Sequence, residues 1–162
     1  MQVLRALSPF VLLVFAVSCA HVPAKAPDKS TLIGAWYGNS LGADSGESGD
    51  NLVVRNADGT FVSYFRLCDE RGEISTIMVE TGRWDYADGV ETTHTLTING
   101  QAVEAGSDYY RESYRLEPLA PDKLKLVSLK AYANGYPEFV STRIGISSFH
   151  LPVEPCSNTA RP

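Results

Sequence analysis

Few residues of the chain could carry chemistry, and their spacing suits none of the common reactions. The histidines are His21, His94 and His150, which form no H-x-x-x-H pair, so the spacing of a zinc site is missing. No serine has the G-x-S-x-G context of a nucleophile elbow. We therefore predict that the protein is not an enzyme and that it uses neither a metal nor a cofactor.

One acidic cluster, in the stretch GADSGESGDN, places Asp44, Glu47 and Asp50 at every third position. Oxygen ligands with this spacing could wrap a calcium ion, although the D-x-D-x-D-G order is absent. The simpler interpretation is a solvated loop, Gly42 to Asp50, whose ordering would cost about 1 to 2 kcal/mol per residue with little burial in return. We expect this loop to be mobile and, if the protein has a hollow interior, to act as a lid over its opening that disfavours anionic ligands.

The first residues have the pattern of an export signal. A short basic start is followed by an apolar run to Val17, which is shorter than the roughly 20 residues needed to span a bilayer. The ending Ala16-Val17-Ser18-Cys19 resembles the bacterial lipobox, and this resemblance implies cleavage before Cys19 and a lipid anchor on its thiol. Since Ala20, and not Asp, follows the cysteine, the resemblance also implies the periplasmic side of the outer membrane. Plain secretion and a retained membrane helix are the alternatives.

The cysteine count agrees with export. Lipidation of Cys19 leaves Cys68 and Cys156 as a pair in an oxidising compartment, and we expect them to form a disulfide. Two buried free thiols are the alternative.

The charge of the chain excludes one class of partner. Removing residues 1–18 takes away Arg5 and no acid, so 14 Lys and Arg become 13 against 19 Asp and Glu, a formal charge of −6. Because an acidic surface repels phosphate backbones, we expect no nucleic-acid partner.

The remaining sequence alternates with period two, which indicates strands. In DKLKLVSL, Leu124, Leu126 and Ser128 share one face, and THTLTING sets a threonine face against an apolar face that holds His94. The predicted strands cover residues 31–37, 52–55, 60–68, 73–81, 83–86, 92–98, 109–117, 123–132 and 138–147. An open sheet of so many strands would expose two edges, whereas a closed barrel exposes none.

The sequence therefore predicts an all-β fold, an antiparallel up-and-down barrel of about eight strands with no substantial helix after the signal peptide. The predicted domains are a signal peptide at 1–18, a lipidated tether at 19–30, the barrel at 31–150 and a C-terminal tail at 151–162.

Three short motifs occur in order along these strands: LIGAWYG with Gly34 and Trp36, DGTF at 58–61, and TGRWDY with Gly82 and Trp84. Together they resemble the bacterial lipocalin-like lipoproteins of the calycin group. The resemblance implies that Trp36 plugs one end of the barrel and that an arginine of the last strand stacks on it. Arg143 is the only basic residue of that strand. Gly34, Trp36 and Arg143 are therefore expected to have structural roles.

Barrels of this size are either filled by side chains or hollow enough for one small ligand. We expect a small apolar ligand, with six candidate wall residues chosen from the alternation: Phe61, Phe65, Trp84, His94, Tyr110 and Tyr114. The alternative is a solid barrel that acts as an interaction or inhibitor module for another envelope protein. A largely apolar pocket of roughly 300 Å³ would favour the ligand.

Overall fold

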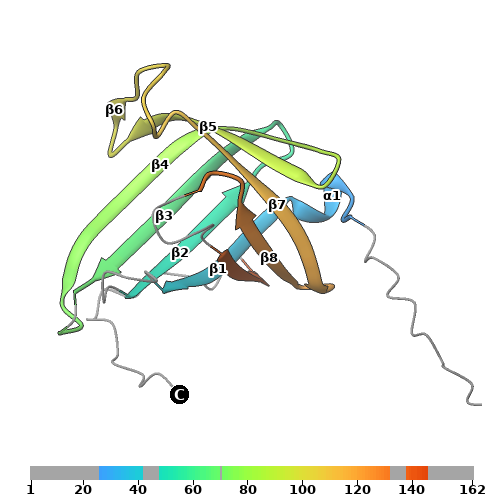
Figure 1. The fold of residues 1–162 in the computed structure, drawn as a ribbon, viewed down its shortest axis with the longest axis horizontal. Helices are drawn as coiled ribbons and strands as arrows, with labels where there is room; N and C mark the ends of the chain where they lie inside the picture. The colour runs from blue at the N-terminus through green and yellow to red at the C-terminus, as the bar shows by residue number, and fades with distance from the viewer. Residues whose placement is uncertain (1–25, 42–47, 70, 132–137, 146–162) are drawn as a thin grey trace, which may run out of the picture.

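The computed structural model describes residues 26–41, 48–69, 71–131 and 138–145, and within them almost all regular structure is strand (Figure 1). The elements are α1 (Lys29–Leu32), β1 (Gly34–Leu41), β2 (Ser48–Arg55), β3 (Thr60–Cys68), β4 (Ile74–Ala87), β5 (Val90–Ile98), β6 (Gln101–Ala102), β7 (Arg111–Ala120), β8 (Lys123–Ser128) and β9 (Glu138–Ile144).

Eight of these strands close into a barrel. The hydrogen-bonded order is β4-β3-β2-β1-β9-β8-β7-β5, every pair is antiparallel, and the pairing of β4 with β5 closes the ring. Strand β6 pairs only with β5 and forms a short hairpin outside the ring (Figure 1). The predicted all-β, up-and-down barrel of about eight strands is confirmed.

Strand β4 corrects the prediction of two separate strands at 73–81 and 83–86. It runs without a break through Gly82, where the register to β5 shifts between Thr81 and Gly82. A Cβ atom on Gly82 would lie 2.0 Å from the carbonyl oxygen of His94. The glycine therefore marks a bulge at which two backbones approach closely, and not a boundary between two strands.

This close approach makes Gly82 sensitive to substitution. We expect Gly82→Ala to lower the free energy of unfolding by about 1 to 3 kcal/mol, since the backbone of β5 must move to admit a methyl group. Urea unfolding followed by circular dichroism measures the change. An unaltered midpoint would contradict the close packing of β4 on β5.

The chain enters the barrel differently from the prediction. Residues 29–32 form the single-turn helix α1, so the predicted first strand, 31–37, starts only at Gly34. The predicted tether includes Lys29, yet the Nζ of Lys29 donates a hydrogen bond to the carboxylate of Asp85 and lies 5.1 Å from the ring centre of Trp84. Figure 1 shows α1 at one end of the barrel, beside the turn between β4 and β5.

The predicted loop Gly42 to Asp50 is wrong at its C-terminal end. Residues Ser48 to Asp50 belong to β2 and pair with β3, and Asp50 is buried against the guanidinium of Arg66. The other six residues, 42–47, lie outside the described residues. So do Cys19 and Cys156, and the predicted lipid anchor and disulfide therefore stay predictions. No helix within the described ranges is long and apolar enough to cross a bilayer.

The hydrophobic core fills the end of the barrel that α1 covers. It consists of Leu32, Trp36, Phe61, Trp84, Leu116, Leu124 and Leu126. Both indoles satisfy their buried N–H groups, because Trp36 Nε1 donates to the carbonyl of Leu32 at 2.9 Å and Trp84 Nε1 to that of Asn56 at 3.0 Å. This end of the barrel is closed and solid.

Candidate functional site

The barrel is hollow beyond this core, with a cavity of about 290 Å³. Every barrel strand except β1 contributes to its wall, and the alternation of each strand decides which residues face inward. The wall residues are Asn51, Val53, Arg55, Phe61, Ser63, Phe65, Met78, Glu80, Glu91, Thr93, Tyr109, Glu112, Tyr114, Leu126, Ser128 and Phe139. Tyr109 is 62% exposed, which places it at the rim.

A buried ion pair crosses the interior. Arg55 of β2 donates from Nε and Nη2 to the two carboxylate oxygens of Glu91 of β5, at 2.6 and 2.7 Å. Both side chains are at most 3% exposed. Two charges so deep in a protein persist only as a pair, since each alone would cost several kcal/mol of lost hydration. The pair therefore joins two walls that are not neighbours in the sheet.

Two further carboxylates face the cavity from β4 and β7. Burial, and then the charge of Glu112, raise the pKa of Glu80 to about 7, against an ordinary value of 4.5, while a hydrogen bond with Thr95 opposes the shift. Glu112 accepts a hydrogen bond from the hydroxyl of Tyr114. Near neutral pH, Glu80 therefore holds its proton about half of the time and can switch between donor and acceptor.

The raised pKa makes stability depend on pH in a defined direction. Between about pH 4.5 and pH 7 the folded protein holds a proton on Glu80 that the unfolded chain has released, so folding is weakened as the pH rises through this window. We expect Glu80→Gln to be more stable than the parent by about 1 to 2 kcal/mol above pH 7, after a discount for the part of the carboxylate that water reaches.

The measurement is urea unfolding of parent and variant at matched pH values. The gap between them should close below about pH 4.5, where Glu80 is neutral in both states. Glu104→Gln, at an exposed carboxylate outside the cavity wall, is the control. A gap that is constant with pH would rule out titration of Glu80 as its cause.

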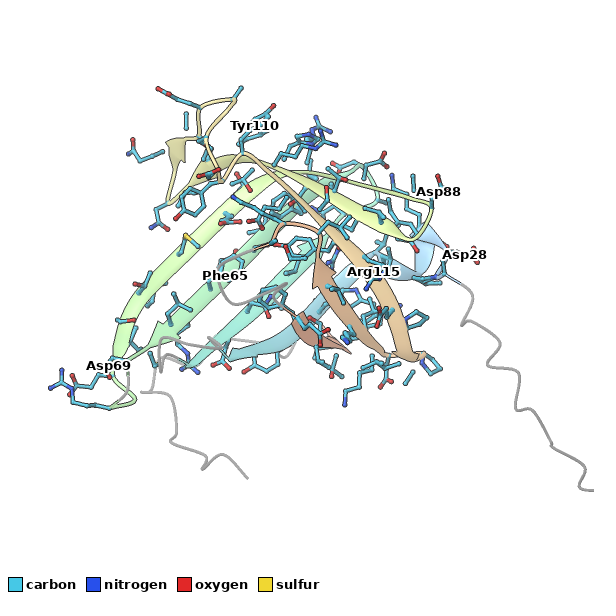
Figure 2. All side chains as sticks on the ribbon, in the orientation of Figure 1. Asp28, Phe65, Asp69, Asp88, Tyr110 and Arg115 are labelled. Atoms are coloured by element: carbon cyan, nitrogen blue, oxygen red, sulfur yellow. The ribbon has the colours of Figure 1, made fainter. Side chains whose placement is uncertain are left out.

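Aromatic rings form much of the apolar wall. Tyr114 and Phe139 meet edge to face, with ring centres 6.0 Å apart. Phe61 lies between core and cavity, and Phe65 extends the apolar wall along the same strand. In Figure 2, Phe65 lies within the outline of the barrel. The wall thus combines broad apolar surface with a few polar groups, as small-molecule sites do.

The six candidate wall residues divide into two groups. Phe61, Phe65 and Tyr114 line the cavity. Trp84 points inward but belongs to the solid core below the cavity. The alternation of β5 places His94 on the face opposite Thr93, where its ring lies 5.5 Å from that of Tyr110, and neither ring lines the cavity.

The placement of His94 and Tyr110 corrects the prediction, and its physical reason is the polarity of the interior. The prediction assumed that the apolar face of THTLTI points inward. Instead its threonine face does: Thr93 lines the cavity and Thr95 is 4% exposed, whereas Leu96 is 44% exposed. The hydroxyl of Thr95 hydrogen-bonds Glu80, so the polar face of this strand meets a polar part of the interior.

Gly34, Trp36 and Arg143 come together at the closed end. The guanidinium of Arg143 lies 5.7 Å from the ring centre of Trp36 and donates to the carbonyls of Thr31 and Ile33 at 3.1 and 2.8 Å. These carbonyls flank the end of α1, where the helix itself offers no donors. Gly34 has φ of +118°, and a Cβ there would touch Arg143 at 3.4 Å. The three residues therefore hold α1 against the barrel.

The polar residues of the cavity are those that sequence reasoning missed. Glu80, Glu91 and Glu112 each stand at an inward position of an alternating strand, and that periodicity is the one signal that could have found them. Within the described part of the chain, no group of three or more His, Cys, Asp or Glu side chains could hold a metal ion. Cys68 is fully buried at the end of β3.

Comparisons with known proteins give little beyond this geometry. No protein-family profile matches the chain, and a search of curated proteins found no match. Among solved structures, one titled "De novo design of a fluorescence-activating beta barrel" is similar at 12% identity with a TM-score of 0.40, over 70% of this chain and 94% of that one.

Proposed function

We propose that the protein binds one small, largely apolar ligand inside its barrel. The observation that carries the proposal is the cavity of about 290 Å³ above a closed core. Its size is close to the lower end of small-molecule sites, about 300 to 1,000 Å³, so the ligand should be small. The alternative, a protein-interaction or inhibitor module, expected a barrel filled by side chains, and the hollow interior disfavours it.

We further propose that the protein is a lipocalin-like lipoprotein, anchored through Cys19 on the periplasmic side of the outer membrane. The lipobox-like residues 16–19 support this part of the proposal. Cys19→Ala should release the protein from the membrane fraction of a Gram-negative host, and the mass of the parent should show acyl chains on Cys19. A parent that fractionates with soluble proteins would contradict the anchor and leave the ligand site untouched.

The ligand site is tested by filling it. Ser63 is 4% exposed and lines the cavity, so Ser63→Phe adds a ring where the ligand would lie. We expect calorimetric titration with 1-octanol, a neutral apolar probe, to show at least about tenfold weaker binding to this variant. Ser75→Phe, at an exposed position outside the cavity wall, is the matched control and should bind like the parent. Equal binding by all three proteins would contradict a site inside the barrel.

A further inference from the structure

The charges that line the cavity do not balance. Four side chains that can be charged near neutral pH face the cavity. Arg55 is basic, and Glu80, Glu91 and Glu112 are acidic. One positive and three negative charges leave a net charge of −2 when all are ionised. Since Arg55 is held by Glu91 through two hydrogen bonds, the excess lies on Glu80 and Glu112.

Three hydrogen-bond donors of the cavity wall are already in use. Arg55 donates to Glu91, Tyr114 donates to Glu112, and the hydroxyl of Ser128 donates to the carbonyl of Lys130. An acceptor is left over. Asn51 is 9% exposed and lines the cavity, and its Oδ1 has no hydrogen-bond partner among the described residues. A buried acceptor without a donor costs about 1 to 3 kcal/mol, but this oxygen is almost completely covered, so the acceptors that a ligand with N–H groups would reach are the carboxylates of Glu80 and Glu112.

Aromatic rings also favour a positive charge at this place. Phe65, Tyr114 and Phe139 line the same cavity as the carboxylates, and the face of such a ring attracts a cation within about 6 Å of its centre. An anionic ligand would instead face two carboxylates at short range in a partly dehydrated site. Charge, hydrogen bonding and ring electrostatics thus point to the same class of ligand.

Building on the proposed ligand site, we propose that the natural ligand is a small organic cation, an amine with an apolar body. Its protonated nitrogen lies between Glu80 and Glu112, and its body contacts the aromatic wall. The other titratable groups that face this position are Arg55 of β2, Glu91 of β5, Tyr114 of β7, and Tyr109, which lies just before β7. The cavity residues of β3, β8 and β9 carry no ionisable side chain.

Binding of an amine should release a proton from Glu80. Below pH 7 Glu80 is mostly neutral in the free protein, because its pKa is raised to about 7. A bound ammonium group stabilises the ionised carboxylate and displaces this proton. Amine affinity should therefore fall as the pH is lowered from about 8 to 5.5, with proton release visible as a dependence of the binding heat on the buffer.

The experiment is calorimetric titration of the full chain with octylamine, 1-octanol and octanoate, which share an eight-carbon body and differ in charge. At about pH 8 we expect octylamine to bind at least about tenfold more tightly than 1-octanol, and octanoate more weakly than either. Glu80→Gln and Glu112→Gln should each remove most of the preference for the amine and preserve the binding of 1-octanol. Glu104→Gln, at an exposed carboxylate, is the control and should keep the preference.

Two contrary results have different meanings. If 1-octanol binds and octylamine binds no better, or if octanoate binds best, the cationic ligand is ruled out and the ligand site stands. If none of the three binds the parent, both proposals fall. A preference for the amine that survives both glutamine variants would also overturn the assignment of the cation to Glu80 and Glu112.

Discussion

Arg55→Met is expected to lower the free energy of unfolding by about 3 to 5 kcal/mol, because it leaves the carboxylate of Glu91 buried without a counter-charge. Glu91 is 1% exposed and accepts two hydrogen bonds from Arg55, at 2.6 and 2.7 Å. Arg55 is the only basic residue among the described residues of the cavity wall, so no other basic residue of that wall can replace the guanidinium. The loss should be measurable by urea unfolding near neutral pH.

A second variant shows whether the lost stability comes from the unpaired charge of Glu91 or from lost packing. In the double variant Arg55→Met/Glu91→Met both charges are absent, and apolar pairs of similar volume are often as stable as the buried ion pair they replace. We expect the double variant to be more stable than Arg55→Met alone. If the two losses simply added, the ion pair would not be the coupled unit described above.

Trp36→Ala is expected to cost about 3 to 5 kcal/mol, the range for removing a large aromatic side chain from a core. Trp36 is 2% exposed, and its indole N–H donates to the carbonyl of Leu32. The guanidinium of Arg143 lies 5.7 Å from the centre of its ring. Its removal opens the closed end of the barrel and loosens α1. Tyr109→Ala, at a rim residue that is 62% exposed, is the control and should change stability far less.

Substitution of Arg143 tests its contact with Trp36 at the closed end of the barrel. Arg143→Ala should cost less than the tryptophan substitution, since it removes a cation over a ring, worth about 0.5 to 2 kcal/mol, and two exposed hydrogen bonds. Made in the Trp36→Ala background, it should cost less still, because the ring is gone. Denaturant unfolding of the two single variants and the double variant gives the coupling. Full additivity would contradict the contact between the two residues.

Alternation and turn signals were sufficient to predict the barrel. Strands such as Thr60–Cys68 and Lys123–Ser128 combine clean period two with well-marked turns. Phe61 and Phe65 face inward as predicted, and Leu124 and Leu126, which are predicted to share one face, both lie in the core. These residues are apolar and point to an apolar part of the interior. In these strands the hydrophobic alternation of the sequence and the observed burial of the side chains agree.

The same reasoning failed where the interior is polar. In β5 the inward side chains are Glu91, Thr93 and Thr95, so the rule that the apolar face points inward selected the wrong one and with it His94. The rule cannot foresee that Arg55 will neutralise Glu91, because these residues are 36 positions apart and meet only in the closed barrel. A glycine at a bulge within a strand and a glycine between two strands also look alike in sequence, which explains why β4 is predicted as two strands divided at Gly82.

The central claim, a ligand inside the barrel, can be tested at one atom. Met1 and Met78 are the two methionines of the sequence, and Met78 lines the cavity. In protein labelled with ¹³C at the methionine methyl group, titration with 1-octanol should shift the Met78 signal until the site is saturated and give nuclear Overhauser contacts between this methyl and the octyl chain. Saturable binding that leaves the Met78 signal in place would contradict the account.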